Sequence, residues 1–464
     1  QNTFVGRGVT LDASARDAGD GGKVVVWSDV ETTFKGQIAA TGGARSGDGG
    51  EVEVSGKQRL NFDGDVNTLA AHGRNGHLLL DPAYLEVGLV ADVNGDSTTG
   101  DDLPGNTLGA ADFGAYSYIT SARVASLLFS GDVTLEATYS LSVTAPLTVA
   151  SGGTRTTLSL FSPQVGIYAP MTLNNAALNV NTGHSVEDGI LVAADVRSLK
   201  TISLTGSDIF IDDAVLSAFS VSLTASPTSG ARIGQTSASS IVANNLVITQ
   251  PSEAVLSVAL NSPRNQAATL DVTAHDASIT LNSLSGGALD VRGAVATTLA
   301  LTTDTGITQN GGPLAVGGAF TLTSTAGNVA LTNSANDFGG LVTFDAAGDL
   351  SLTSSGSLQA TGSADGDIAL TALAGRFILG GDISTLCNCS TTSIDISGVG
   401  FNNAAGGLLL GPAGSRFFIR SSDWTLDNLG PLNFGGGAHD VNYVVYNGWR
   451  GADPASGNGY YTNR

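Results

Sequence analysis

One acidic segment carries oxygen ligands at alternate positions, as calcium-binding loops do. Its candidate ligands are Asp92, Asn94, Asp96, Thr98, Asp101 and Asp102. The first four occupy positions 1, 3, 5 and 7 of such a loop, where Thr98 would offer its backbone carbonyl. Position 12, acidic in these loops, is Leu103. The segment is therefore interpreted either as a calcium site that orders a loop or as a solvated turn.

Two cysteines, Cys387 and Cys389, form a Cys-x-Cys pair. A zinc site needs about four ligands, and no histidine is near the pair in sequence. On a strand both thiols would face the same side, and a disulfide between them would be strained. The alternatives are two small core or turn residues, or a redox or intermolecular disulfide role.

Adjacent carboxylates at Asp212 and Asp213 raise the question of glycosidase chemistry. That chemistry needs two carboxylates held about 5–10 Å apart, which adjacency in sequence does not establish. The chain also contains no Gly-x-Ser-x-Gly elbow, P-loop or dinucleotide fingerprint. We expect no enzymatic activity and place the pair in a turn; a polysaccharide-processing enzyme is the alternative.

Short internal repeats predict the elements that position these residues. A glycine, a polar residue and an alternating apolar strand recur at 327–332, 348–353 and 366–371, a spacing that suits one coil of a β-solenoid. A longer pattern, Gly-Asp-Gly-Gly followed by alternating valines, recurs at 19–26 and 47–54. Repeats of this kind, with one apolar face per strand, indicate an all-β parallel β-helix whose coils bury that face by stacking.

Composition supports a packed but strongly acidic protein. The 464 residues include 62 glycines, 42% are hydrophobic and only 13% are charged, with a net charge of −21. Hydrophobic content at this level exceeds that of disordered chains. The negative charge argues against nucleic acid as a partner, and no apolar run approaches the roughly 20 residues of a transmembrane helix.

Four segments follow from these patterns. Residues 1–88 form the first coils, 89–129 an irregular insertion with at most one short helix, and 130–415 the main β-helix. Residues 416–464 form an aromatic segment expected to cap the last coil or to mediate assembly. Its aromatic side chains are Phe417, Phe418, Trp424, Tyr443, Tyr446, Trp449, Tyr460 and Tyr461.

Several sequence motifs of the chain resemble those of filamentous-haemagglutinin-like exoproteins of two-partner secretion systems. The Gly-Asp-Gly-Gly repeats, His-Leu-Leu-Leu-Asp-Pro at 77–82, Asn-Asp-Phe-Gly-Gly-Leu-Val at 336–342 and Arg-Phe-Phe-Ile-Arg-Ser-Ser-Asp at 416–423 carry the resemblance. It implies a right-handed parallel β-helix at the cell surface or outside a Gram-negative bacterium. The family's amino-terminal secretion domain has no recognisable counterpart here, so the outer-membrane transporter is expected as a partner of the precursor.

The resemblance implies adhesion to cell-surface or matrix glycans, or self-assembly head to tail into filaments of an extracellular or biofilm matrix. A chain that serves only as the shaft of a larger adhesin is a further alternative. Calcium is the one cofactor that we expect, at the acidic segment.

Overall fold

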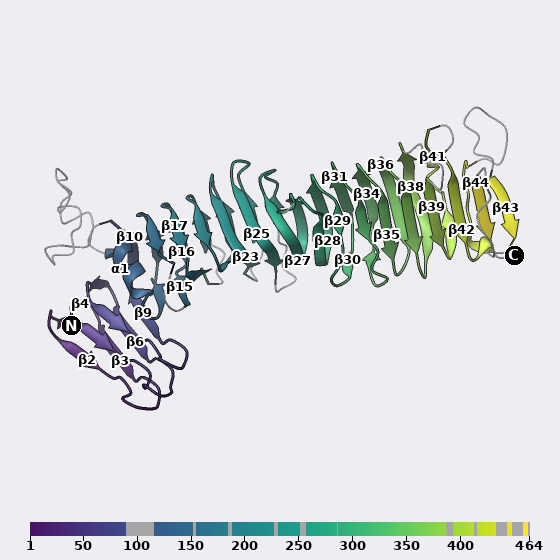
Figure 1. The fold of residues 1–464 in the computed structure, drawn as a ribbon. Coiled ribbons are helices and arrows are strands. Elements are labelled where there is room, and N and C mark those ends of the chain that lie inside the picture. Colours follow the sequence, from purple (N-terminus) through teal and green to yellow (C-terminus); the bar gives the residue numbers. More distant parts are fainter. Residues whose placement is uncertain are drawn as a thin grey trace, which may run out of the picture. The chain divides into compact units, whose positions relative to one another are not determined.

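The chain folds as a parallel β-solenoid whose coils stack strand upon strand (Figure 1). A computed structural model describes residues 1–89, 116–151, 155–183, 188–226, 231–250, 257–284, 286–386, 393–412, 415–432, 443–447 and 458–462. Two compact units divide the chain, Gln1–Ala243 and Asn244–Arg464. The predicted all-β parallel solenoid is confirmed, with about 15 turns in total.

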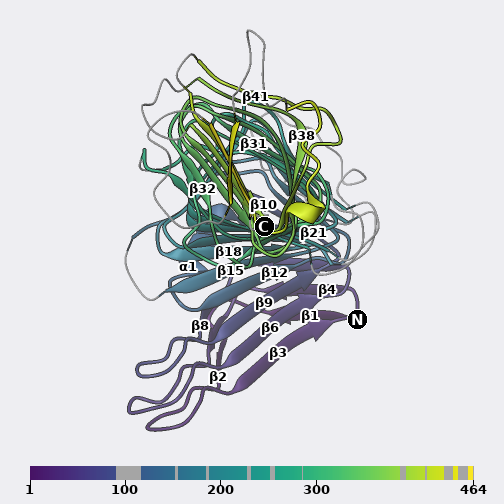
Figure 2. The ribbon, with the colours of Figure 1, turned by 90° about the vertical axis from the view of Figure 1, so that its right-hand side faces the viewer.

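Three strand ladders form the first unit. The first ladder consists of β3 (Lys23–Ser28), β6 (Glu51–Gly56), β9 (His77–Pro82), β12 (Asp132–Glu136), β15 (Thr156–Phe161), β18 (Ala176–Asn181), β21 (Thr201–Gly206) and the end of β23 (Val215–Ala225). Figure 2 shows β3, β6 and β9 side by side.

The second ladder is built largely from strands that follow those of the first ladder along the chain. Its first part is a separate three-stranded sheet of β1 (Asn2–Val5), β4 (Glu31–Phe34) and β7 (Arg59–Phe62). Its longer part contains β11 (Tyr116–Thr120), β10 (Tyr84–Gly88), β13 (Ser140–Val143), β16 (Gln164–Ile167), β19 (Gly189–Val192), β22 (Asp208–Ile211) and β24 (Arg232–Gln235). We call the outward side of this longer part the second face.

The third ladder is built from shorter strands. It consists of a separate three-stranded sheet of β2 (Thr10–Asp12), β5 (Gln37–Ala39) and β8 (Asp65–Asn67). A second set follows in the chain: β14 (Leu147–Val149), β17 (Met171–Leu173), β20 (Val196–Ser198) and the start of β23.

The longer repeat of the sequence corresponds to one coil at this end of the chain. Lys23 pairs with Glu51 in the first ladder, and Glu31 pairs with Arg59 in the second. The two residues of each pair are the same number of residues apart in both ladders. Equivalent side chains of successive coils therefore stack directly. Phe34 and Phe62 lie with ring centroids 5.6 Å apart and planes within 13°, both buried.

At the carboxyl end of the expected insertion, residues 116–127 contain the one short helix that was allowed there, and also a strand that was not expected. Tyr116–Thr120 forms β11, and helix α1 (Ser121–Leu127) follows directly. The Thr120 hydroxyl accepts a hydrogen bond from the Arg123 backbone N–H, which starts the helix. Val124 is fully buried, and α1 contacts both β8 and β14.

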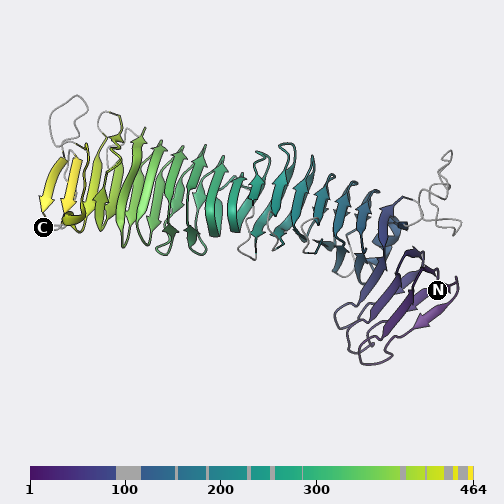
Figure 3. The same cartoon turned by 180° about the vertical axis from the view of Figure 1, so that it is seen from behind.

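The second unit continues the coil pattern (Figure 3). Its strands are β26 (Ser257–Leu260), β27 (Gln266–Thr280), β28 (Leu289–Thr303), β29 (Ile307–Thr308), β30 (Leu314–Val316), β31 (Phe320–Ser324), β32 (Val329–Leu331), β33 (Asp337–Phe338), β34 (Leu341–Ala346), β35 (Leu350–Ser354), β36 (Leu358–Ala364), β37 (Ile368–Ala372), β38 (Arg376–Thr385), β39 (Ile394–Gly398), β40 (Gly400–Asn402), β41 (Leu409–Leu410), β42 (Phe417–Ser421), β43 (Tyr443–Asn447) and β44 (Asn458–Thr462). The strand β25 (Ser240–Thr249) crosses the chain division, and a 3₁₀ turn covers Trp424–Leu426.

The three short repeats stack directly on one another in this unit. Val329 pairs with Leu350, which pairs with Ile368. The polar residues before these strands are linked from coil to coil by hydrogen bonds, and we call this row of linked turns the turn ladder. The Asn328 side-chain oxygen accepts a hydrogen bond from the Asp349 backbone N–H at 2.9 Å, and the Asp349 carboxylate accepts one from the Asp367 backbone N–H at 2.9 Å.

The glycines that begin the short repeats leave room for this turn ladder. A Cβ atom on Gly348 would lie 2.4 Å from the Asn328 side-chain oxygen, and one on Gly366 would lie 2.2 Å from that of Asp349. Both would also meet backbone atoms of the preceding coil at 2.7 Å. Each repeat therefore encodes a buried strand and the turn that joins it to the next coil.

Candidate functional site

A groove of about 490 Å³ lies on the second face of the first unit. It runs from β11 across β13, β16 and β19 to β22, and its floor consists of outward positions of these strands. The three strand steps from β13 to β22 span roughly 14 Å. The groove therefore has the length of an extended ligand and lies across the strands.

The missing side chain of Gly189 hollows the groove, whereas Gly166 in the adjoining row is covered. In one outward row Ser142 pairs with Gly166 and then Leu191, and in the next row Gln164 pairs with Gly189. A Cβ atom on Gly189 would meet its nearest neighbour, the Asp208 carbonyl oxygen, at 3.4 Å, an ordinary contact distance. A methyl group would therefore fit at Gly189, and a longer side chain there would project into the groove.

Aromatic rings flank this hollow. Tyr168 and Phe210 are 55% and 39% exposed, although their neighbours in the strands are buried. The Tyr168 ring lies over Gly166, because a Cβ atom there would come within 2.4 Å of it. The register of β22 holds the Phe210 ring, and Gly166 leaves room for the Tyr168 ring, which follows β16, to lie over it.

A stack of three tyrosines lies at the β11 end of the groove. The Tyr84 ring lies 5.0 Å from that of Tyr116 and 4.9 Å from that of Tyr139. Tyr139 is 56% exposed, and Tyr116 is itself a lining residue. The second face therefore presents aromatic surface at both ends of a polar floor.

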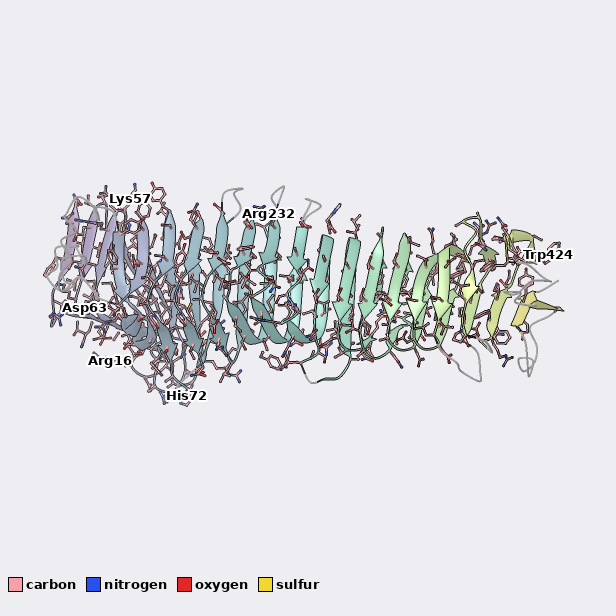
Figure 4. The ribbon with its side chains drawn as sticks, turned by 90° about the horizontal axis from the view of Figure 1, so that it is seen from above. Arg16, Lys57, Asp63, His72, Arg232 and Trp424 are labelled. Atoms are coloured by element: carbon pink, nitrogen blue, oxygen red, sulfur yellow. The ribbon has the colours of Figure 1, made fainter. Side chains whose placement is uncertain are left out.

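Hydroxyl, amide and carboxylate groups supply hydrogen bonds between the rings. Ser140, Ser142, Gln164 and Asp208 all line the groove. Asp208 forms an ion pair with Arg232 at 3.0 Å, in the next strand of the ladder. Figure 4 shows the Arg232 side chain on the outer surface.

Exposed ring faces beside polar side chains suit a ligand with an apolar side and many hydroxyl groups. An aromatic ring carries negative charge on its face, which attracts weakly positive C–H groups. Serine, glutamine and carboxylate groups donate to or accept from hydroxyls. The groove can therefore hold an amphipathic, uncharged chain without covalent chemistry.

A second hollow, of about 420 Å³, lies in the second unit. Its lining residues include His275, Val295 and Asp337, and no phenylalanine, tyrosine or tryptophan is among them. The two hollows have similar volumes, so aromatic rings, not size, distinguish the first.

The expected aromatic segment near the carboxyl end is partly buried. Phe417, Phe418, Tyr460 and Tyr461 are buried, whereas Trp424 is 49% exposed and lies at the surface in Figure 4. The backbone places Tyr443 and Tyr446 on β43, which pairs with β44; their side chains, and Trp449, lie outside the described residues. The role of this segment in capping or assembly stays a prediction.

One arginine holds two of the buried rings together. The Arg420 guanidinium lies 5.3 Å from the Phe418 centroid and 4.9 Å from that of Tyr461. It also donates to both Asp395 carboxylate oxygens, at 2.9 and 3.1 Å. Strands β39, β42 and β44 are thereby tied together at the side-chain level, which strengthens the coil stack at this position.

The remaining predicted sites lie mostly outside the described residues. This applies to the whole calcium segment, Asp92, Asn94, Asp96, Thr98, Asp101 and Asp102, and to Cys387 and Cys389. Among the described residues no group of three or more His, Cys, Asp or Glu is arranged to hold a metal ion. Within those same ranges, no helix has the length and apolar content needed to cross a membrane.

Asp213 occupies a turn, as expected. It has a positive φ of 49°, and its carboxylate accepts a hydrogen bond from the Thr236 hydroxyl at 2.9 Å. The Thr236 hydroxyl in turn accepts one from the Asp213 backbone N–H at 3.0 Å. These contacts give the Asp213 carboxylate a part in holding the turn.

Comparison with known proteins locates one repeat family in the chain. Residues 271–345 match a family described as repeats of unknown function (DUF5649). No curated protein sequence matches the chain. The matched residues cover β28 and most of the second hollow, but not the groove of the first unit.

The sequence analysis missed the groove, although one signal was present. Phe210 stands between Ile209 and Ile211, which are both buried, so alternation alone places its ring outward. Tyr168 follows a strand that includes Gly166 at an outward position. A search for bulky aromatic residues at outward positions would have found these rings, but not their alignment across coils.

Proposed function

We propose that this chain is a structural and adhesive β-solenoid that acts at a cell surface or in an extracellular matrix. The observation that carries the proposal is the groove on the second face, with its exposed rings and polar floor. Such a surface costs free energy in contact with water and is typical of binding sites. The coil ladders hold its parts in fixed register without contribution from the ligand.

The phrases that resemble filamentous-haemagglutinin-like exoproteins support this function and two-partner secretion from a Gram-negative bacterium. The solenoid fold is compatible with them, but it also serves other functions. The groove favours adhesion over head-to-tail assembly, because it lies along a side of the coils.

An adhesion assay tests the proposal. Beads coated with the chain are counted on a panel of bacterial and animal cells after washing, with Gly189→Leu and Gly189→Ala beads beside them. We expect wild-type and Gly189→Ala beads to adhere and Gly189→Leu beads to lose most of their adhesion, because leucine fills the groove. Absence of adhesion to every cell type would contradict the adhesive function.

The alternative, a polysaccharide-processing enzyme, makes a different prediction. It requires release of new reducing ends when the chain is incubated with polysaccharides. Their appearance, and its loss in an Asp208→Asn variant, would replace the adhesive proposal with a catalytic one.

A further inference from the structure

We infer that the groove of the second face binds an uncharged polysaccharide, by stacking sugar rings on Tyr168 and Phe210. This inference rests on the proposed adhesive function and names its ligand class. The aromatic faces supply apolar contact for the C–H side of each sugar, and the floor between them supplies hydrogen-bonding groups.

The direction of the groove fits a polymer. Its rings occupy different coils, Tyr168 directly after β16 and Phe210 on β22, with β19 between the two strands. The Tyr168 ring covers Gly166, so Leu191 lies between the two rings in their row. The hollow above Gly189 runs beside them in the adjoining row, between Gln164 and Asp208. A single sugar would reach one ring, whereas a chain of several sugars would contact both.

Charge decides between neutral and acidic polymers. The protein carries a net charge of −21, and carboxylates of Glu86, Asp188 and Asp208 lie in or beside the groove. The basic side chain in the adjoining register position, Arg232, is paired with Asp208. An anionic polysaccharide would be repelled by this field, whereas an uncharged one would not.

Affinity electrophoresis through gels containing a polysaccharide measures this binding with the whole chain. The probes are hydroxyethyl cellulose, galactomannan and dextran as uncharged polymers, and alginate as the anionic one. We expect at least one uncharged polymer to retard the chain and alginate to leave its mobility unchanged.

Variants locate the contact. Tyr168→Ala and Phe210→Ala should each weaken binding about tenfold, since each removes one stacking surface. Gly189→Leu should abolish it, while Gly189→Ala should retain it. Phe219→Ala is the matched control, because Phe219 is also exposed, at 57%, but lines a different hollow.

Three outcomes would overturn the inference: no retardation by any uncharged polymer, preference for alginate, or equal retardation of wild type and Gly189→Leu. Groove-dependent binding of a hydrophobic dye without a polysaccharide response would indicate an apolar protein partner instead. Adhesion that is lost in Gly189→Leu without polysaccharide binding would leave the adhesive function standing and refute only the ligand class.

Discussion

The second face of the first unit and the turn ladder of the second unit are both built from stacked coils, but glycine has a different role in each. In the turn ladder, Gly348 and Gly366 pack against the preceding coil, and the side chains of Asn328 and Asp349 bind the backbone of the following one. On the second face, a Cβ atom on Gly189 would lie at ordinary contact distances from its neighbours, 3.4 and 3.7 Å. In the turn ladder, glycine allows two coils to pack closely. On the second face, it leaves room above the sheet.

This difference separates scaffold from surface. Residues that repeat from coil to coil hold the stack together, because a repeated contact can be satisfied only by a repeated partner. Residues that break the repeat, such as Phe210, contribute little to stacking. Outward-facing residues of a solenoid can therefore be substituted while the strand ladders stay intact.

The largest predicted contrast is between a buried and an exposed phenylalanine. Phe377 is fully buried and stacks on Phe401 at 6.0 Å, so Phe377→Ala should lower the free energy of unfolding by about 3–5 kcal/mol. Phe210→Ala should change it by about 0.5 kcal/mol or less. Urea denaturation followed by circular dichroism measures both, and similar losses would contradict the assignment of Phe210 to the surface.

The same substitution at two glycines sharpens the comparison. Gly366→Ala should destabilise the protein by about 1–3 kcal/mol, because the new methyl group meets backbone atoms of the preceding coil. Gly189→Ala should stay within about 0.5 kcal/mol of wild type. If the two variants unfold at the same urea concentration, the turn ladder has no special role.

A pH effect is expected on the first ladder, where three carboxylates lie close together. Burial, and then the charges of Asp81 and Glu53, raise the pKa of Glu136, while burial and Glu53 raise the pKa of Asp81. A raised carboxyl pKa means that the folded state binds protons more tightly than the unfolded one. The contribution of these groups to stability is therefore lost as pH rises through the folded pKa values.

Glu136→Gln isolates this contribution. The variant should be more stable than wild type at about pH 7, and the difference should shrink below about pH 4, where the wild-type carboxyl becomes protonated in both states. Urea midpoints of the two proteins across this range measure it. A difference that is constant with pH would show that the charge of Glu136 is not involved.

The scaffold was more predictable than the site, for a physical reason. Coil length at the amino end and the register of 327–332, 348–353 and 366–371 follow from repeated apolar positions, which need only alternation and glycine to be recognised. The groove depends on which outward positions meet across coils of unequal length. Gln164 pairs with Gly189, and Gly189 pairs with Asp208 after a shorter stretch of chain.

Strand β11, and the exact position of the short helix α1, were not predicted for a related reason. Besides β10 and β14, they contact β7 and β8, which lie much earlier in the chain. One such contact is the hydrogen bond of 2.8 Å from the Leu60 backbone N–H to the Ser117 hydroxyl. A local sequence pattern does not predict contacts with residues so distant in the chain.

The separation of scaffold and surface is tested most directly by measuring polysaccharide retardation and urea midpoint together for Gly189→Leu and Gly366→Ala. We predict that Gly189→Leu loses binding with an unchanged midpoint, and that Gly366→Ala keeps binding under native conditions with a lowered midpoint. Loss of both properties in either variant would contradict the claim that different residues carry them.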